Sequence, residues 1–147
     1  MHRNHSFALV GTLCTIITAL AFAGCASSPK QANASADASK AVAKMIAKTG
    51  SAPLFFKDRE AASGITGSIS ETSQLKFAVL LDRDLKQFSQ YSAAPFDCDT
   101  QEIVESIQKR VRSGGSEFTF THLGLSITVV PVRQDETLCG YAAVGAL

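Results

Sequence analysis

The feature that most constrains this chain is an uncharged apolar run near its start, from Ser6 to Gly24 (SFALVGTLCTIITALAFAG). A short segment carrying Arg3 precedes the run, and small residues followed by polar chain end it. At about 1.5 Å per residue, a helix of this length almost spans a bilayer. A basic start, an apolar centre and a small-residue end are typical of a secretory signal, which is removed from the mature protein. The remaining chain has room for one small domain.

The run leads into Phe22-Ala23-Gly24-Cys25, which resembles the lipobox of bacterial lipoproteins. The resemblance covers residues 1–26 only. It implies cleavage before Cys25 and acylation of the cysteine, and such acyl chains anchor a protein stably at a membrane. Ala26 follows the cysteine, which by the sorting rule of enteric-type bacteria implies the outer membrane, with the protein facing the periplasm. The alternatives are an uncleaved membrane anchor and an ordinary secretory signal.

Charge divides the mature chain into two parts. Residues 25–52 contain four Lys and one Asp, whereas residues 53–147 contain nine Lys and Arg against twelve Asp and Glu. A nucleic-acid-binding protein would need a concentrated basic face, so this balance argues against nucleic-acid partners. The lysines of the first part have two readings, attraction to anionic lipid headgroups or a solvated tether.

Cys98 and Cys139 are the two cysteines left after Cys14 is removed and Cys25 is lipidated. An even pair in an oxidising compartment predicts a disulfide. A disulfide between them would close a loop of about 40 residues, which stabilises a small domain by about 4 kcal/mol in the chain-entropy model. The alternative is a reactive thiol at Cys98, because it lies just before a predicted helix start.

Residues 26–39 are small, polar and alanine-rich, and we expect a flexible tether there. Residues 36–50 (ADASKAVAKMIAKTG) place apolar side chains on one helical face and Lys40, Lys44 and Lys48 on another. This helix has three readings: it lies on a membrane surface, binds a partner, or packs on its own domain. The predicted organisation is therefore a cleaved signal (1–24), a lipidated tether with an amphipathic helix (25–52) and a domain (53–147).

The first half of the domain predicts strands and a short helix. PLFFK (53–57) reads as a strand in which the adjacent Phe55 and Phe56 face opposite ways, leaving one of them exposed as a possible partner contact. A hairpin is expected from 64–70 and 75–82, with alternate residues of the second strand buried. An aspartate at 82 or 84 then caps a short helix through Tyr91.

The second half predicts a helix followed by three strands. Residues 99–115 combine a capping-box-like start, an apolar stripe, a basic last turn and two closing glycines. Strands are expected at 117–121, 125–132 and 138–146, and Pro131 predicts a sheet edge or a strand end. The fold class is α+β: a small antiparallel sheet with helices packed on one face, preceded by the lipidated tether.

No arrangement of residues predicts catalysis, a cofactor or a metal site. His122 is the single histidine after residue 5, and it falls in a tight connection between two predicted strands. The acidic group Asp97, Asp99 and Glu102 lacks the pattern of a calcium loop, and helix capping already explains two of its members. We therefore expect a protein that is not an enzyme.

The favoured function is that of an envelope lipoprotein that binds a protein partner, as an accessory or assembly factor of an envelope or secretion complex. The alternative is a periplasmic carrier or sensor of a small apolar ligand, held in a pocket lined by Phe77, Val79, Ile107 and Ile127. A third hypothesis, a hydrolase that uses His122, predicts activity that is lost in His122→Ala while the fold is kept.

Overall fold

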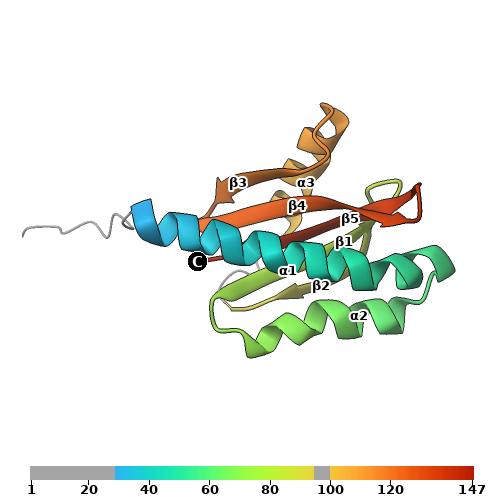
Figure 1. Ribbon diagram of the computed structural model, residues 1–147, viewed down its shortest axis with the longest axis horizontal. Helices are drawn as coiled ribbons and strands as arrows, with labels where there is room; N and C mark the ends of the chain where they lie inside the picture. The colour runs from blue at the N-terminus through green and yellow to red at the C-terminus, as the bar shows by residue number, and fades with distance from the viewer. Residues whose placement is uncertain (1–28, 95–99) are drawn as a thin grey trace, which may run out of the picture.

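A computed structural model describes residues 29–94 and 100–147 of the chain, and it has the expected α+β architecture. Its elements in chain order are α1 (Pro29–Phe56), α2 (Arg59–Gly67), a 3-10 turn η1 (Ser68–Glu71), β1 (Leu75–Asp82), β2 (Gln87–Ser92), α3 (Thr100–Arg112), β3 (Phe118–His122), β4 (Leu125–Gln134) and β5 (Thr137–Ala146). The strands form one five-stranded antiparallel sheet with the order β2-β1-β5-β4-β3 (Figure 1).

The first and last strands of the chain pair at the centre of the sheet. The ladder between β1 and β5 runs from Leu75 opposite Ala146 to Asp82 opposite Gly140. Gly140 is required there, because a Cβ at this position would lie 2.0 Å from the carbonyl oxygen of Leu81. Nearly every residue of β1 is buried, so this strand is covered on both faces rather than alternating between core and solvent.

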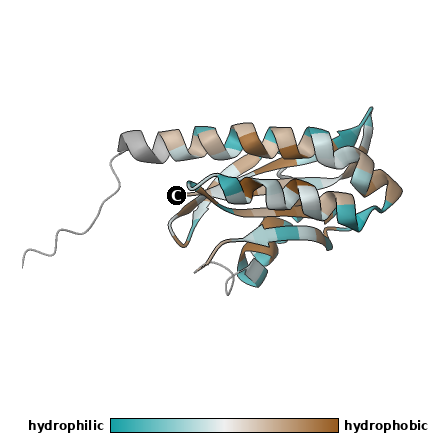
Figure 2. Ribbon diagram, turned by 90° about the horizontal axis from the view of Figure 1, so that it is seen from below, coloured by the Kyte–Doolittle hydropathy of each residue, from teal (hydrophilic) through white to brown (hydrophobic). Residues whose placement is uncertain are grey.

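Helices cover both faces of the sheet, which differs from the expected packing on one face. On one face α1 and α2 pack on side chains that include Ala78 and Leu80. On the other face α3 packs on Phe77, Val79 and Leu81 of the same strand. Because β1 is apolar on both sides, each side needs a cover. Figure 2 shows the first layer edge-on, with α1 along the top and hydrophobic segments of the strands beneath it.

Helix α1 is much longer than the predicted helix at 36–50, and it replaces both the end of the tether and the strand predicted at 53–57. Its 28 residues run without interruption through Pro53. The strand prediction was wrong because Leu54 is held in the core by helical packing. The chain leaves the helix at Lys57, which has a φ of 61°, and the Asp58 amide then donates to the Pro53 carbonyl at 2.9 Å.

Buried side chains decide between the three readings of this helix in favour of packing on its own domain. Ala43 and Ile46 are fully buried against the sheet. The Ser39 hydroxyl also lies 2.8 Å from that of Thr128 on β4, and the Ser35 hydroxyl donates to the carbonyl of Leu147. The sheet and α1 therefore share one core, with no structural break at residue 53.

The predicted strand at 64–70 was also wrong, since these residues form the end of α2 and then η1. Asp58 caps α2, because its Oδ1 accepts a hydrogen bond from the Ala61 amide at 3.0 Å. The Thr66 hydroxyl, buried on α2, lies 2.7 Å from the Ser89 hydroxyl on β2. This polar contact fixes α2 over the edge of the sheet.

The short helix predicted after residue 82 is instead a turn followed by strand β2. Asp82 Oδ1 accepts hydrogen bonds from the amides of Asp84 and Lys86, both at 2.9 Å, and Leu85 has a φ of 62°. An aspartate that accepts local backbone bonds stabilises a turn as readily as a helix start. An aspartate was correctly assigned to local backbone hydrogen bonds, but Asp82 stabilises a turn and not the start of a helix.

The last helix and the three C-terminal strands confirm the prediction closely. The strands β3, β4 and β5 join through tight turns, in which Leu123, Gly124 and Asp135 have positive φ values. Pro131 lies beyond the last pair of the β3–β4 ladder, Phe118 with Val129, so β3 does not need its missing N–H. Of the helices in the described ranges, none has the length and apolarity needed to cross a membrane.

Candidate functional site

Two of the three cysteines predicted to carry chemistry, Cys25 and Cys98, lie outside the described residues. Cys139 is half-buried near the start of β5, on the face covered by α1, and it makes no disulfide with a described residue. Helix α3 begins at Thr100 on the opposite face of the sheet. The Cys98–Cys139 disulfide stays a prediction. Lipidation of Cys25 also stays a prediction.

His122 is the last residue of β3 and contacts helix α3. Its Nε2 lies 3.8 Å from Glu102 Oε2, is buried and makes no hydrogen bond with a described residue. Glu102, from the predicted acidic group, therefore faces a histidine, while Asp97 and Asp99 lie outside the described residues. Within the described ranges, no three His, Cys, Asp or Glu side chains gather in a group able to hold a metal ion.

The apolar pocket expected between sheet and helix is filled by its own side chains. Phe77, Val79, Ile107 and Ile127 are each 0% exposed and belong to the core cluster under α3. These four residues come together as expected, but they pack against one another. The interior is therefore closed at this place, and the ligand-sized cavities described below lie at the surface.

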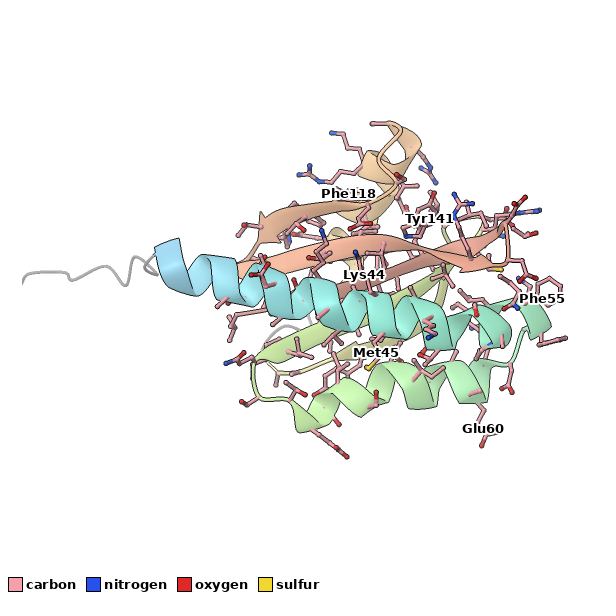
Figure 3. The ribbon with its side chains drawn as sticks, viewed as in Figure 1. Lys44, Met45, Phe55, Glu60, Phe118 and Tyr141 are labelled. Atoms are coloured by element: carbon pink, nitrogen blue, oxygen red, sulfur yellow. The ribbon has the colours of Figure 1, made fainter. Side chains whose placement is uncertain are left out.

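One surface cavity lies where α3 ends and β3 begins. It has a volume of about 620 Å³ and is lined by Ser106, Lys109, Arg110, Ser113, Gly115 and Phe118; we call it the α3–β3 groove. Cavities that hold small molecules usually have volumes of about 300–1,000 Å³. Figure 3 shows Phe118 on β3 beside the end of α3. This groove is the candidate binding site.

The groove is electropositive, because its charged lining residues, Lys109 and Arg110, are both basic. Neither side chain makes an ion pair with a described residue. The Arg110 guanidinium carbon lies 4.6 Å from the centre of the Phe120 ring, so a cation–π contact orients this side chain. Phe118 supplies an apolar wall of the same groove.

Glu117, the residue before Phe118, connects the edge of the groove to helix α1. One Glu117 oxygen lies 3.2 Å from Lys40 Nζ and 3.6 Å from Lys44 Nζ, both on α1. The hydrogen bond from Lys40 and the charge of Lys44 lower the pKa of the Glu117 carboxyl below its usual value of 4.5. Figure 3 shows Lys44 on the side of α1 toward β3. Two of the three predicted lysines thus bind the sheet domain rather than a lipid surface.

Another cavity, of about 250 Å³, lies beside the end of α1 and includes Leu54, Phe55 and Cys139 in its lining. Phe55 and Phe56 next to it are 55% and 77% exposed, and their rings meet edge to face at 5.2 Å between centroids. The sequence predicted one exposed phenylalanine in a strand, whereas both are exposed at the end of helix α1. Figure 3 shows Phe55 at this end of the helix. This phenylalanine pair is a second candidate surface.

The comparisons with known proteins give one family. The model of the CHASE8 family, described as a periplasmic sensor domain, matches residues 31–144. The match covers most of α1, the strands β1 to β4 and most of β5, in agreement with the shared core. The search of curated proteins found no match.

Proposed function

We propose that this chain, which belongs to the CHASE8 family of periplasmic sensor domains, is a lipid-anchored sensor that binds a small molecule in the α3–β3 groove and reports binding through α1. A sensor needs a binding site and a route from that site to an output. Here the lipid on Cys25 holds the chain at a membrane of the envelope, the outer membrane by the sorting rule. The protein itself performs no catalysis.

The observation that carries this proposal is the contact of Glu117 with Lys40 and Lys44. Glu117 directly precedes a groove residue, and α1 begins at Pro29, four positions after Cys25. A ligand that displaces the segment around Phe118 therefore acts on the helix next to the anchor. The proposed site is not the pocket expected from the sequence for an apolar ligand, because the side chains expected to line that pocket are packed in the core.

Native mass spectrometry of the protein, isolated in mild detergent from its own envelope, tests the proposal. We expect a fraction of the protein to carry an additional small-molecule mass that is released on unfolding. Protein that is free of small molecules but held in a stoichiometric complex with another protein would contradict it. That result would instead support the role of an accessory factor.

The phenylalanine pair favours a second candidate function, contact with an envelope protein. Exposed aromatic side chains are the residues that most often anchor protein interfaces. A photo-crosslinking residue placed at Phe56 should capture one defined envelope protein, whereas the same residue at Met45, which is 52% exposed on α1, should not. Equal capture from both positions would contradict a specific contact at the helix end.

A further inference from the structure

We infer that the ligand of the α3–β3 groove is a small organic anion, a carboxylate carried on a flat apolar group. This inference rests on the proposed sensor function and adds the chemical class that the groove selects. Its grounds are the unpaired basic side chains, the apolar wall and the space between them.

The positive charge in the groove is available to a ligand. Lys109 and Arg110 make no ion pair within the described residues, although residues 53–147 carry an excess of acidic side chains. The contact with Phe120 holds the Arg110 guanidinium in place, so less side-chain freedom is lost when an anion binds. A guanidinium can donate two parallel hydrogen bonds to one carboxylate, which makes arginine the usual partner for this group.

Stabilisation of the helix end does not account for these cations. Basic residues are favoured in the last turn of a helix because they interact with its dipole. In α3, however, backbone amides already bond the final carbonyls: Ser113 N donates to Lys109 O, and Gly115 N donates to Arg110 O, both at 3.1 Å. Arg112 lies in the same turn but does not line the groove. It satisfies the dipole equally well and serves as an internal control.

The apolar half of the ligand follows from Phe118 and Gly115. A Cβ at Gly115 would lie 2.9 Å from Phe118 Cδ1 and 3.1 Å from the Arg110 carbonyl oxygen, so the Phe118 ring packs closely on the end of α3 and is held as a wall of the groove. A flat group stacked on an aromatic ring gains about 0.5–1.5 kcal/mol beyond its buried area. Hydroxyls of Ser106 and Ser113 line the same cavity and offer further polar contacts.

Isothermal titration calorimetry on the detergent-purified protein tests the class with three probes: benzoate, benzamide and inorganic phosphate. Benzamide keeps the shape of benzoate without its charge, and phosphate keeps charge without a ring. We expect benzoate to bind with a Kd of about 1 mM or lower, and each of the other probes to bind about tenfold more weakly. Equal affinity for benzamide, or no heat with benzoate, would overturn the inference.

Three variants locate the binding. Arg110→Gln and Gly115→Ala should each weaken benzoate binding by about tenfold, because one removes a charged donor and the other pushes the Phe118 ring out of its place in the groove wall. Arg112→Gln removes the same charge from the same helical turn and should leave the Kd within about twofold. Circular dichroism confirms that each variant is folded. An unchanged Kd in both Arg110→Gln and Gly115→Ala would overturn the groove as the site.

The outcomes also separate this inference from the sensor function. A neutral co-purified molecule, together with no benzoate binding, would keep the sensor function and reject the anionic class. Benzoate binding in the groove of a protein that never carries a small molecule in its envelope would keep the anion site and reject the sensor function.

Discussion

Replacing Ile46 with alanine tests whether α1 is part of the folded domain or a tether beside it. Ile46 is 0% exposed and belongs to the core cluster between α1 and the sheet. The substitution removes three carbons at about 0.8 kcal/mol each, and the cavity that they leave adds a further cost. We therefore expect the free energy of unfolding to fall by about 3 kcal/mol, which lowers the melting temperature by about 10 °C.

Urea unfolding followed by circular dichroism measures this change, and the neighbouring residue provides the matched control. Met45 is 52% exposed on the same helical turn, so Met45→Ala should change the free energy by less than about 0.5 kcal/mol. If Ile46→Ala were as stable as Met45→Ala, α1 would not contribute to the core. The shared core and the route from groove to anchor would then both be refuted.

Three further predictions concern the acidic link, the lipid and the thiols. Because the folded-state pKa of Glu117 lies below 4.5, its ion pairs stabilise the fold above that value and are lost as the pH falls through the lowered pKa. Thermal melts should therefore show wild type more stable than Glu117→Gln at neutral pH and equal to it in acid; a constant difference would exclude the ion pairs as its cause. Cys25→Ser should remain uncleaved and unacylated in a gel-shift and acyl-labelling assay, and normal processing would contradict the lipobox. Thiol counting on the delipidated, unfolded protein should find no reactive thiol at Cys98 and Cys139, and two reactive thiols would exclude the disulfide.

The C-terminal half of the fold was predictable from local pattern. In α3 the apolar residues recur at helical spacing and are buried together, and basic residues and glycines mark its end. The strands β3, β4 and β5 are separated by turns too short for any other connection than an antiparallel one. Local pattern is sufficient there because each element carries its own start and end.

The N-terminal half was harder to predict because its helices have few large apolar residues. Alanine and serine fill the first turns of α1, and this composition is typical of both a tether and a helix with a small-residue face. The face is buried only because the sheet lies beneath it, with Ser39 against Thr128. Pro53 added to the error, since proline is disfavoured inside helices.

The groove depends on contacts that sequence spacing does not show. Lys109 and Arg110 were identified as the end of a helix, and the glycines after them as its termination. Only the return of the chain into β3 brings Phe118 beside them. The sequence held no signal for this groove, because basic residues that cap a helix and basic residues that bind a ligand look the same in sequence. The absence of ion pairs at Lys109 and Arg110 is seen only in the described part of the structure.

Hydrogen exchange of the α1 amides, measured with and without saturating benzoate, tests the central claim most directly. The account predicts altered exchange between Lys40 and Lys48 as well as in residues 113–118, and loss of the α1 response in Glu117→Gln. A change confined to residues 113–118 would show that the groove binds an anion without reporting it, and would contradict the sensor mechanism.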